Sequence, residues 1–145
     1  MLIESDTIKL LRECDAGVKM GISAIEDTSK YVKDPEFKKI LSENKIDHEK
    51  LDVIIEEELS RFHDEGKEPE MIAKGMSWLK TNVKLAMDAS DGTVADLITD
   101  GCNMGVKYLS GYLNKYKAAD ERSKDIAKNL ITLEERLAVD VRKYL

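Results

Sequence analysis

The chain has 145 residues, a formal net charge of −6 at pH 7 and 36% charged residues, but only two prolines and two phenylalanines. This length is sufficient for one compact domain with its own hydrophobic core. Acidic and basic residues are interleaved, so no basic stripe can neutralise phosphates, which argues against a nucleic acid partner. No apolar run approaches the ~20 residues that span a bilayer, and the N-terminus is charged, so we expect a cytoplasmic protein without membrane contact.

Helix-start signals divide the chain into five segments. Asp34 precedes a proline, Pro69 stands at the start of a further segment, Thr93 and Asp96 form a capping box, and Asp120 opens the last segment. Leu, Ile, Ala, Lys and Glu are abundant, which favours helix over strand. The sequence therefore predicts helices at about residues 4–31, 35–63, 69–88, 93–117 and 120–144.

The spacing of apolar residues predicts how these segments assemble. Each of the four long segments carries an apolar stripe at helical spacing, which is typical of a bundle. Short turns make antiparallel hairpins of the first two and the last two long helices. The connection at 64–92 is long enough to cross the bundle, so that the second and third long helices run parallel. We therefore expect an all-α four-helix bundle, one domain over residues 1–145, with a fifth, shorter helix in the crossover.

Two short motifs indicate an internal duplication. The stretch "CDAGVK" at Cys14–Lys19 and the stretch "CNMGVK" at Cys102–Lys107 share four of six residues. The second and fourth long helices superpose on their apolar stripes when His48 is aligned with Glu134. The bundle is then two similar hairpins related by a pseudo-two-fold axis. Neither cysteine has a CxxC partner, so both are expected to be reduced thiols in the core.

The two hairpins, the long crossover and the weak internal symmetry resemble the ferritin-like superfamily. Within it, the chain is similar to small bacterial proteins of unassigned or stress-associated function. The stretch "MIAKGMSWLK" followed by "DASDGTVADLI" is similar to their crossover, with Trp78 in the place of their common tryptophan. The resemblance covers nearly the whole chain. It implies that a di-iron centre would need one Glu from each of the first and third long helices and a Glu-x-x-His pair from each of the others.

This sequence departs from that ligand pattern. His48 lies on an apolar stripe, but Lys45 stands three residues before it where a Glu is required. Glu134 also lies near the inward face, but Leu137 stands where a His is required. A di-iron site in this chain is therefore degenerate, and we expect no iron centre and no cofactor.

The inward polar residues are the candidates for any site. They are Asn44, His48, Glu134 and, if it turns inward from the stripe edge, Asp15. The first interpretation is that His48 hydrogen-bonds Glu134 or Asn44 across the core and that the protein is metal-free. The alternative is a degenerate metal-binding oxidoreductase or metal-storage relative that holds a single ion near His48 and Glu134. No residue is singled out as catalytic.

One apolar stripe of the crossover helix is expected to lie on the bundle. A second stripe is formed by Met71, Trp78 and Leu85, spaced by seven residues. Its spacing is too regular for scattered exposed residues. Either the crossover helix buries both of its faces, or a second copy or another protein covers this one. We therefore expect a homodimer or a protein partner at this face, and a function in association.

Overall fold

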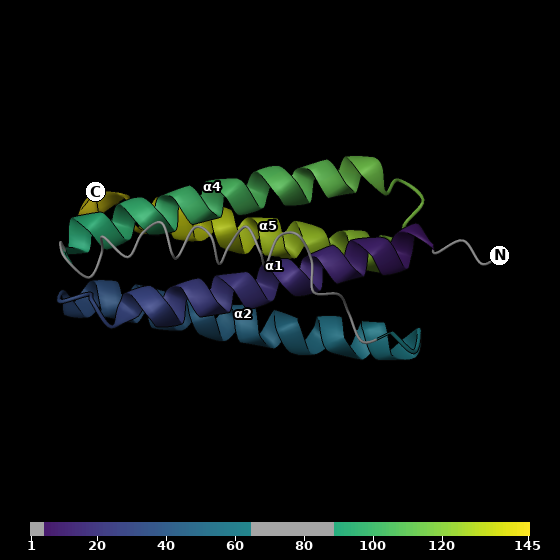
Figure 1. The fold of residues 1–145 in the computed structure, drawn as a ribbon, viewed down its shortest axis with the longest axis horizontal. Helices are drawn as coiled ribbons and strands as arrows, with labels where there is room; N and C mark the ends of the chain where they lie inside the picture. The colour runs from purple at the N-terminus through teal and green to yellow at the C-terminus, as the bar shows by residue number, and fades with distance from the viewer. Residues whose placement is uncertain (1–4, 65–88) are drawn as a thin grey trace.

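The computed structural model describes residues 5–64 and 89–145, which form an all-α four-helix bundle (Figure 1). Its helices are α1 (Asp6–Ser29), α2 (Pro35–Arg61), α4 (Asp91–Lys115) and α5 (Glu121–Asp140), followed by the 3-10 turn η2 (Arg142–Tyr144). The predicted bundle is confirmed. The fifth helix expected at 69–88 lies outside the described residues, as do Met71, Trp78 and Leu85.

The helix directions follow from hydrogen bonds at the two ends of the bundle. At one end, the carboxylate of Asp91 accepts hydrogen bonds from the backbone N–H groups of Lys33 and Asp34, at 2.8 and 3.0 Å. These two bonds place the start of α4 beside the turn between α1 and α2. At the other end, the backbone N–H of Asp120 donates to Thr7 Oγ1 at 2.8 Å, which places the start of α5 beside the start of α1. Helices α2 and α4 therefore run parallel, as expected, and so do α1 and α5.

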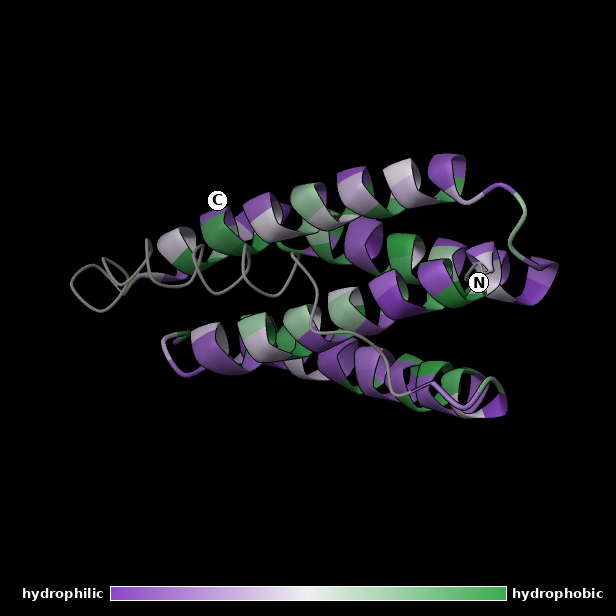
Figure 2. Ribbon diagram, turned by 45° about the vertical axis from the view of Figure 1, so that its right-hand side comes forward, coloured by the Kyte–Doolittle hydropathy of each residue, from purple (hydrophilic) through white to green (hydrophobic). Residues whose placement is uncertain are grey.

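Around the bundle the helices follow the order α1, α2, α5, α4, so each parallel pair lies on a diagonal. Figure 2 shows the apolar residues on the inner faces of the helices and the hydrophilic residues on the outer faces. Among the described helices, none combines the length and the apolar character that crossing a bilayer requires.

The helix starts confirm two predicted caps and correct a third. The side chains of Asp34 and Asp120 accept hydrogen bonds from the third residue of α2 and of α5, as N-caps do. The capping box predicted from Thr93 to Asp96 is wrong. Helix α4 begins earlier, because Ser90 is its N-cap and accepts the hydrogen bond of the Thr93 N–H at 3.1 Å. This earlier start puts Asp91 in the first turn, where it reaches the turn between α1 and α2.

The C-terminus of α2 closes in a Schellman motif. His63 adopts a left-handed conformation with φ of 55°, and its N–H donates to Ser60 O, while the Asp64 N–H donates to Leu59 O, both at 3.0 Å. The Asp64 carboxylate then accepts two hydrogen bonds from the Arg12 guanidinium of α1, at 2.5 and 3.1 Å. The last turn of α2 is thereby fixed against the first turns of α1. His63 is exposed.

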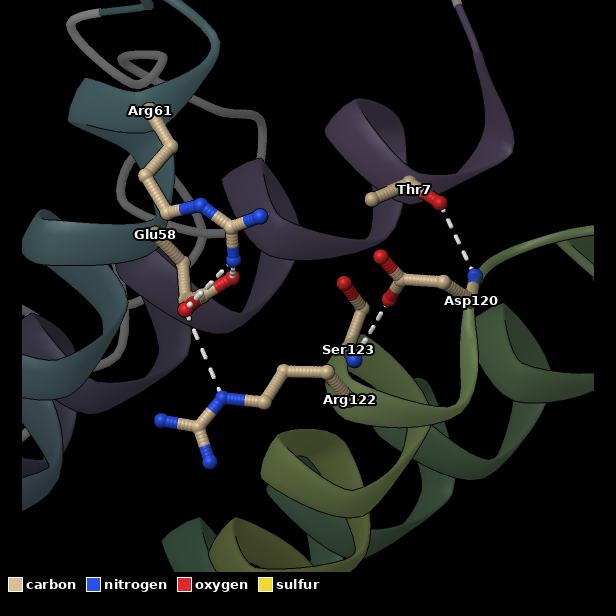
Figure 3. Close-up of polar contacts among 6 residues, drawn as sticks. All are labelled: Thr7, Glu58, Arg61, Asp120, Arg122 and Ser123. Carbon is tan, nitrogen blue, oxygen red and sulfur yellow. Dashed lines mark hydrogen bonds and ion pairs between the residues drawn. The ribbon is translucent and has the colours of Figure 1, made fainter.

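A buried carboxylate ties α2 to α5 at the same end of the bundle (Figure 3). Glu58 is 6% exposed and accepts hydrogen bonds from Arg61 Nη1 at 3.0 and 3.2 Å and from Arg122 Nε at 3.4 Å. Both arginines remain largely exposed. The carboxyl group is almost out of water, and the two guanidinium groups supply the partners that its burial requires.

The buried apolar residues form two clusters, one towards each end of the bundle. Along α1 and α2, Val18 and Leu51 belong to one cluster, and Ile25 and Leu41 belong to the other. The same division separates Leu130 from Leu137 on α5 and Leu109 from Cys102 on α4. A layer at the middle of the bundle therefore lies between two apolar cores.

Asp91→Ala is expected to lower the free energy of unfolding by about 1–3 kcal/mol. The substitution leaves two backbone N–H groups of the turn between α1 and α2 without their acceptor and removes a negative charge from the first turn of α4. Asp96→Ala is the matched control, since Asp96 is exposed on the same helix and should change stability by less than about 0.5 kcal/mol. Urea unfolding followed by circular dichroism measures both. Equal losses would restore Asp96 as a capping residue.

Candidate functional site

The middle layer of the bundle holds a buried histidine and a buried glutamate. His48 of α2 has no exposed surface, and Glu134 of α5 is 8% exposed. His48 Nε2 lies 2.8 Å from Glu134 Oε1. Gly21 of α1 and Gly105 of α4 flank the two side chains, so all four helices contribute to this layer.

The partners of the imidazole fix its protonation. His48 Nδ1 lies 3.0 Å from the backbone oxygen of Asn44, and a carbonyl oxygen only accepts, so Nδ1 carries a hydrogen. The other ring nitrogen faces a carboxylate, which also accepts unless it is protonated. One proton therefore lies between Nε2 and Oε1. Burial lowers the pKa of His48, but the hydrogen bond and the charge of Glu134 outweigh it, with smaller contributions from Asn44 O and Asp47, so the pKa is raised. The hydrogen bond and the charge of Glu134 thus favour the protonated form of the His48 imidazole.

Gly21 is a glycine because the imidazole fills the space where a side chain would lie. A Cβ added at Gly21 would lie 2.8 Å from both Cδ2 and Nε2 of His48, which is closer than real Cβ atoms approach. At Gly105 the nearest atoms of Glu134 lie at 3.5 Å, which is ordinary van der Waals contact. Helix α1 therefore meets the histidine ring through its backbone, whereas α4 has room for a methyl group.

Asn44 joins the layer from one turn before His48. It is 6% exposed, and its Nδ2 donates to the backbone oxygen of Leu133 at 3.3 Å. Its Oδ1 is buried and has no donor within hydrogen-bond distance among the described residues. The residue therefore holds α2 against α5 with its amide nitrogen and leaves one buried acceptor unsatisfied.

Asp15 lies in a separate cluster between α1 and α2. Its side chain is bonded to Lys19 Nζ, which also lies 3.0 Å from Asp52 Oδ1 and 3.2 Å from Glu56 Oε1. Burial raises the pKa of Asp15, although Lys19 opposes the rise. Among the described residues, these three carboxylates alone bring three metal-ligating side chains within 4.8 Å of one another, and the Lys19 ammonium forms an ion pair with each of them. The structure thus brings Asn44, His48 and Glu134 together and leaves Asp15 outside the layer.

Both cysteines are buried free thiols, as expected. Burial raises the pKa of Cys14 to about 12, with the charges of Glu13 and Asp15 adding to it. Burial also raises the pKa of Cys102, and the charge and hydrogen bond of Glu134 raise it further. A thiol reacts as a nucleophile only in its thiolate form, so neither cysteine is activated.

Sequence reasoning missed Gly21 and Lys19. Gly21 stands on the apolar stripe of α1 between Val18 and Ile25, and a glycine at such a position indicates that a partner approaches closely. Lys19 stands one helical turn after Asp15, the spacing at which opposite charges meet on a helix surface. Both signals were present in the sequence.

Comparison of the chain with protein-family models, with curated proteins and with solved structures finds no match. The chemistry of the middle layer therefore carries the functional argument.

Alanine at the glycines of α1 and α4 should separate their roles. Gly21→Ala is expected to lower the free energy of unfolding by about 1–3 kcal/mol, because the methyl group displaces the imidazole. Gly111→Ala, where no atom lies within 4 Å, should raise it by up to about 1 kcal/mol through helix propensity. Gly105→Ala should behave like Gly111→Ala. Urea unfolding of the three variants measures this order, and a neutral Gly21→Ala would contradict the close approach.

Single and double substitutions of the pair should be strongly non-additive. His48→Leu strands a buried carboxylate and is expected to cost about 3–5 kcal/mol. Adding Glu134→Leu removes the stranded charge, so the double variant should be more stable than His48→Leu alone. Thermal and urea unfolding of the two single variants and the double variant measure the coupling. Additive losses would show that the two side chains do not depend on each other.

Proposed function

We propose that this protein is a ferritin-like bundle in which a histidine–glutamate pair stands in place of a di-iron centre, and that it acts through association with itself or with another protein. The architecture supports the first part. Two antiparallel hairpins with α2 parallel to α4 have the topology of ferritin-like bundles. The sequence resemblance of the crossover points to the same superfamily.

The observation that carries the proposal is the hydrogen bond between His48 and Glu134. Two metal ions in such a bundle require about four carboxylates and two imidazoles. The middle layer offers one of each, and the ring nitrogen that would bind a metal faces the carboxylate with a proton between them. A metal would have to displace that proton, because imidazole binds metals in its neutral form.

A single ion near His48 and Glu134 is the competing function, as a degenerate oxidoreductase or a metal-storage relative. It requires a third charged ligand at the same level of the bundle. Asp15, the carboxylate expected for that place, is bonded to Lys19 in another cluster. The geometry therefore favours association over metal chemistry.

An apolar face suited to association is predicted from the sequence of the crossover. Met71, Trp78 and Leu85 form a stripe of large apolar residues, and Trp and Met are enriched in interface cores. On the described surface, Ile46 and Val53 are also seven residues apart on α2 and are 47% and 56% exposed. Apolar residues repeated every seven positions suit a helical partner.

Trp78→Glu tests the association. We expect the wild-type protein to have twice the 16.4 kDa chain mass in light scattering and Trp78→Glu to be a folded helical monomer. Lys80→Glu, which changes charge in the same stretch without removing an apolar residue, should remain a dimer. A variant that unfolds places Trp78 in the core, and one that keeps its mass and stability removes this face from the proposal. Uptake of two iron ions per chain, measured in parallel by metal analysis, would contradict the absence of a di-iron centre.

A further inference from the structure

The proton between His48 and Glu134 joins the two hairpins at the middle of the bundle. His48 belongs to the hairpin of α1 and α2, and Glu134 belongs to the hairpin of α4 and α5. The pair separates the two apolar clusters, and both side chains are almost out of water. An unpaired charge at such a place is costly, so the protonation of the pair is coupled to the packing of the hairpins.

We propose that this pair is a proton-operated lock between the two hairpins, closed while the shared proton is present and released when it is lost as pH rises. In the closed form both ring nitrogens of His48 donate, one to Asn44 O and one to Glu134 Oε1. Every hydrogen-bonding atom of the imidazole is then satisfied within the layer.

Loss of the proton cannot leave both hydrogen bonds in place. A neutral imidazole carries one hydrogen. If it stays on Nδ1, a lone pair of Nε2 faces the Glu134 carboxylate; if it moves to Nε2, a lone pair of Nδ1 faces Asn44 O. Either arrangement puts two acceptors in contact in a buried layer, and water is the donor that can separate them. The unsatisfied Asn44 Oδ1 in the same layer offers such a water a further partner.

The other titratable groups around the layer do not change charge in the range where His48 does. The Cys102 thiol faces the layer from α4. Its pKa is raised by burial and by Glu134, so the thiol stays neutral. From α1 it receives the backbone of Gly21, and the nearby Lys19 ammonium is kept protonated because its carboxylate partners raise its pKa. On α2 itself, Asp47 adds a negative charge that favours the imidazolium. The imidazole is therefore the group that controls the lock.

The direction of the effect follows from the raised pKa of His48. A group whose pKa is higher in the folded state stabilises that state fully below its unfolded pKa, which for histidine is about 6.5. This stabilisation is lost as pH rises through the higher folded pKa. The hairpins should thus be held most firmly below about pH 6.5 and should loosen as pH rises through the folded pKa of His48.

Histidine NMR and amide hydrogen exchange on the intact chain test the lock. His63 is the only other histidine, and a His63→Gln variant identifies its resonance. We expect His48 to titrate above 6.5, and amides at the centre of α2 and α5 to exchange up to about tenfold faster per unit of pH between 6.5 and that midpoint and to level off above it, after correction for intrinsic exchange.

Glu134→Gln is the matched control. Its amide nitrogen can donate to Nε2 of a neutral imidazole whose Nδ1–H still donates to Asn44 O, so the layer is satisfied without the extra proton. The variant should lower the His48 midpoint below that of the wild type and remove the additional exchange at higher pH. The proposal is overturned if wild-type His48 titrates at or below about 6.5, or if wild type and Glu134→Gln loosen alike. If Glu134→Gln does not fold, the wild type decides alone, since the additional exchange must stop rising at the His48 midpoint.

Discussion

The 2.8 Å contact between His48 Nε2 and Glu134 Oε1 is the constraint on which the centre of this bundle depends. Neither side chain can be buried as a charge without the other. The residues around the pair support this contact. Gly21 has no side chain and leaves room for the imidazole ring, and the backbone oxygen of Asn44 accepts the hydrogen of His48 Nδ1. A buried ion pair adds little net stability over an apolar pair of similar volume. Its effect here is on specificity, because one register of α2 against α5 brings the two groups together.

The difference between the two partners is consistent with the internal duplication that the sequence predicts. Under that prediction His48 and Glu134 are equivalent residues of two similar hairpins, and the structure brings them into contact. Two carboxylates or two imidazolium ions at that place would repel each other in a medium of low dielectric constant. A base opposite an acid is complementary. The apolar cores on either side, and the polar ties made by Asp91 and Glu58 at the ends, complete the join between the hairpins.

The helices and the central pair were predictable from the sequence because periodicity and capping act locally. The apolar stripes placed His48 and Glu134 on inward faces, and Asp34 and Asp120 marked the N-termini of α2 and α5 as N-caps. Other features depended on neighbours. Ser90 and Thr93 are both able to cap a helix. Ser90 is the residue that caps α4, and the carboxylate of Asp91, which follows it, bonds to the turn between α1 and α2. Asp15 lies at the edge of the apolar stripe, so the stripe alone does not predict whether its side chain turns inward. In the structure its ion pair with Lys19 keeps it out of the middle layer.

The middle of the bundle holds a proton between His48 and Glu134 in place of a metal ion. Anomalous diffraction from crystals grown at neutral pH and soaked in Mn(II) tests this most directly. We predict no anomalous peak in the middle layer and an unchanged separation of about 2.8 Å between His48 Nε2 and Glu134 Oε1. A manganese ion bonded to either side chain would contradict the claim, because the imidazole would then have exchanged its shared proton for a metal.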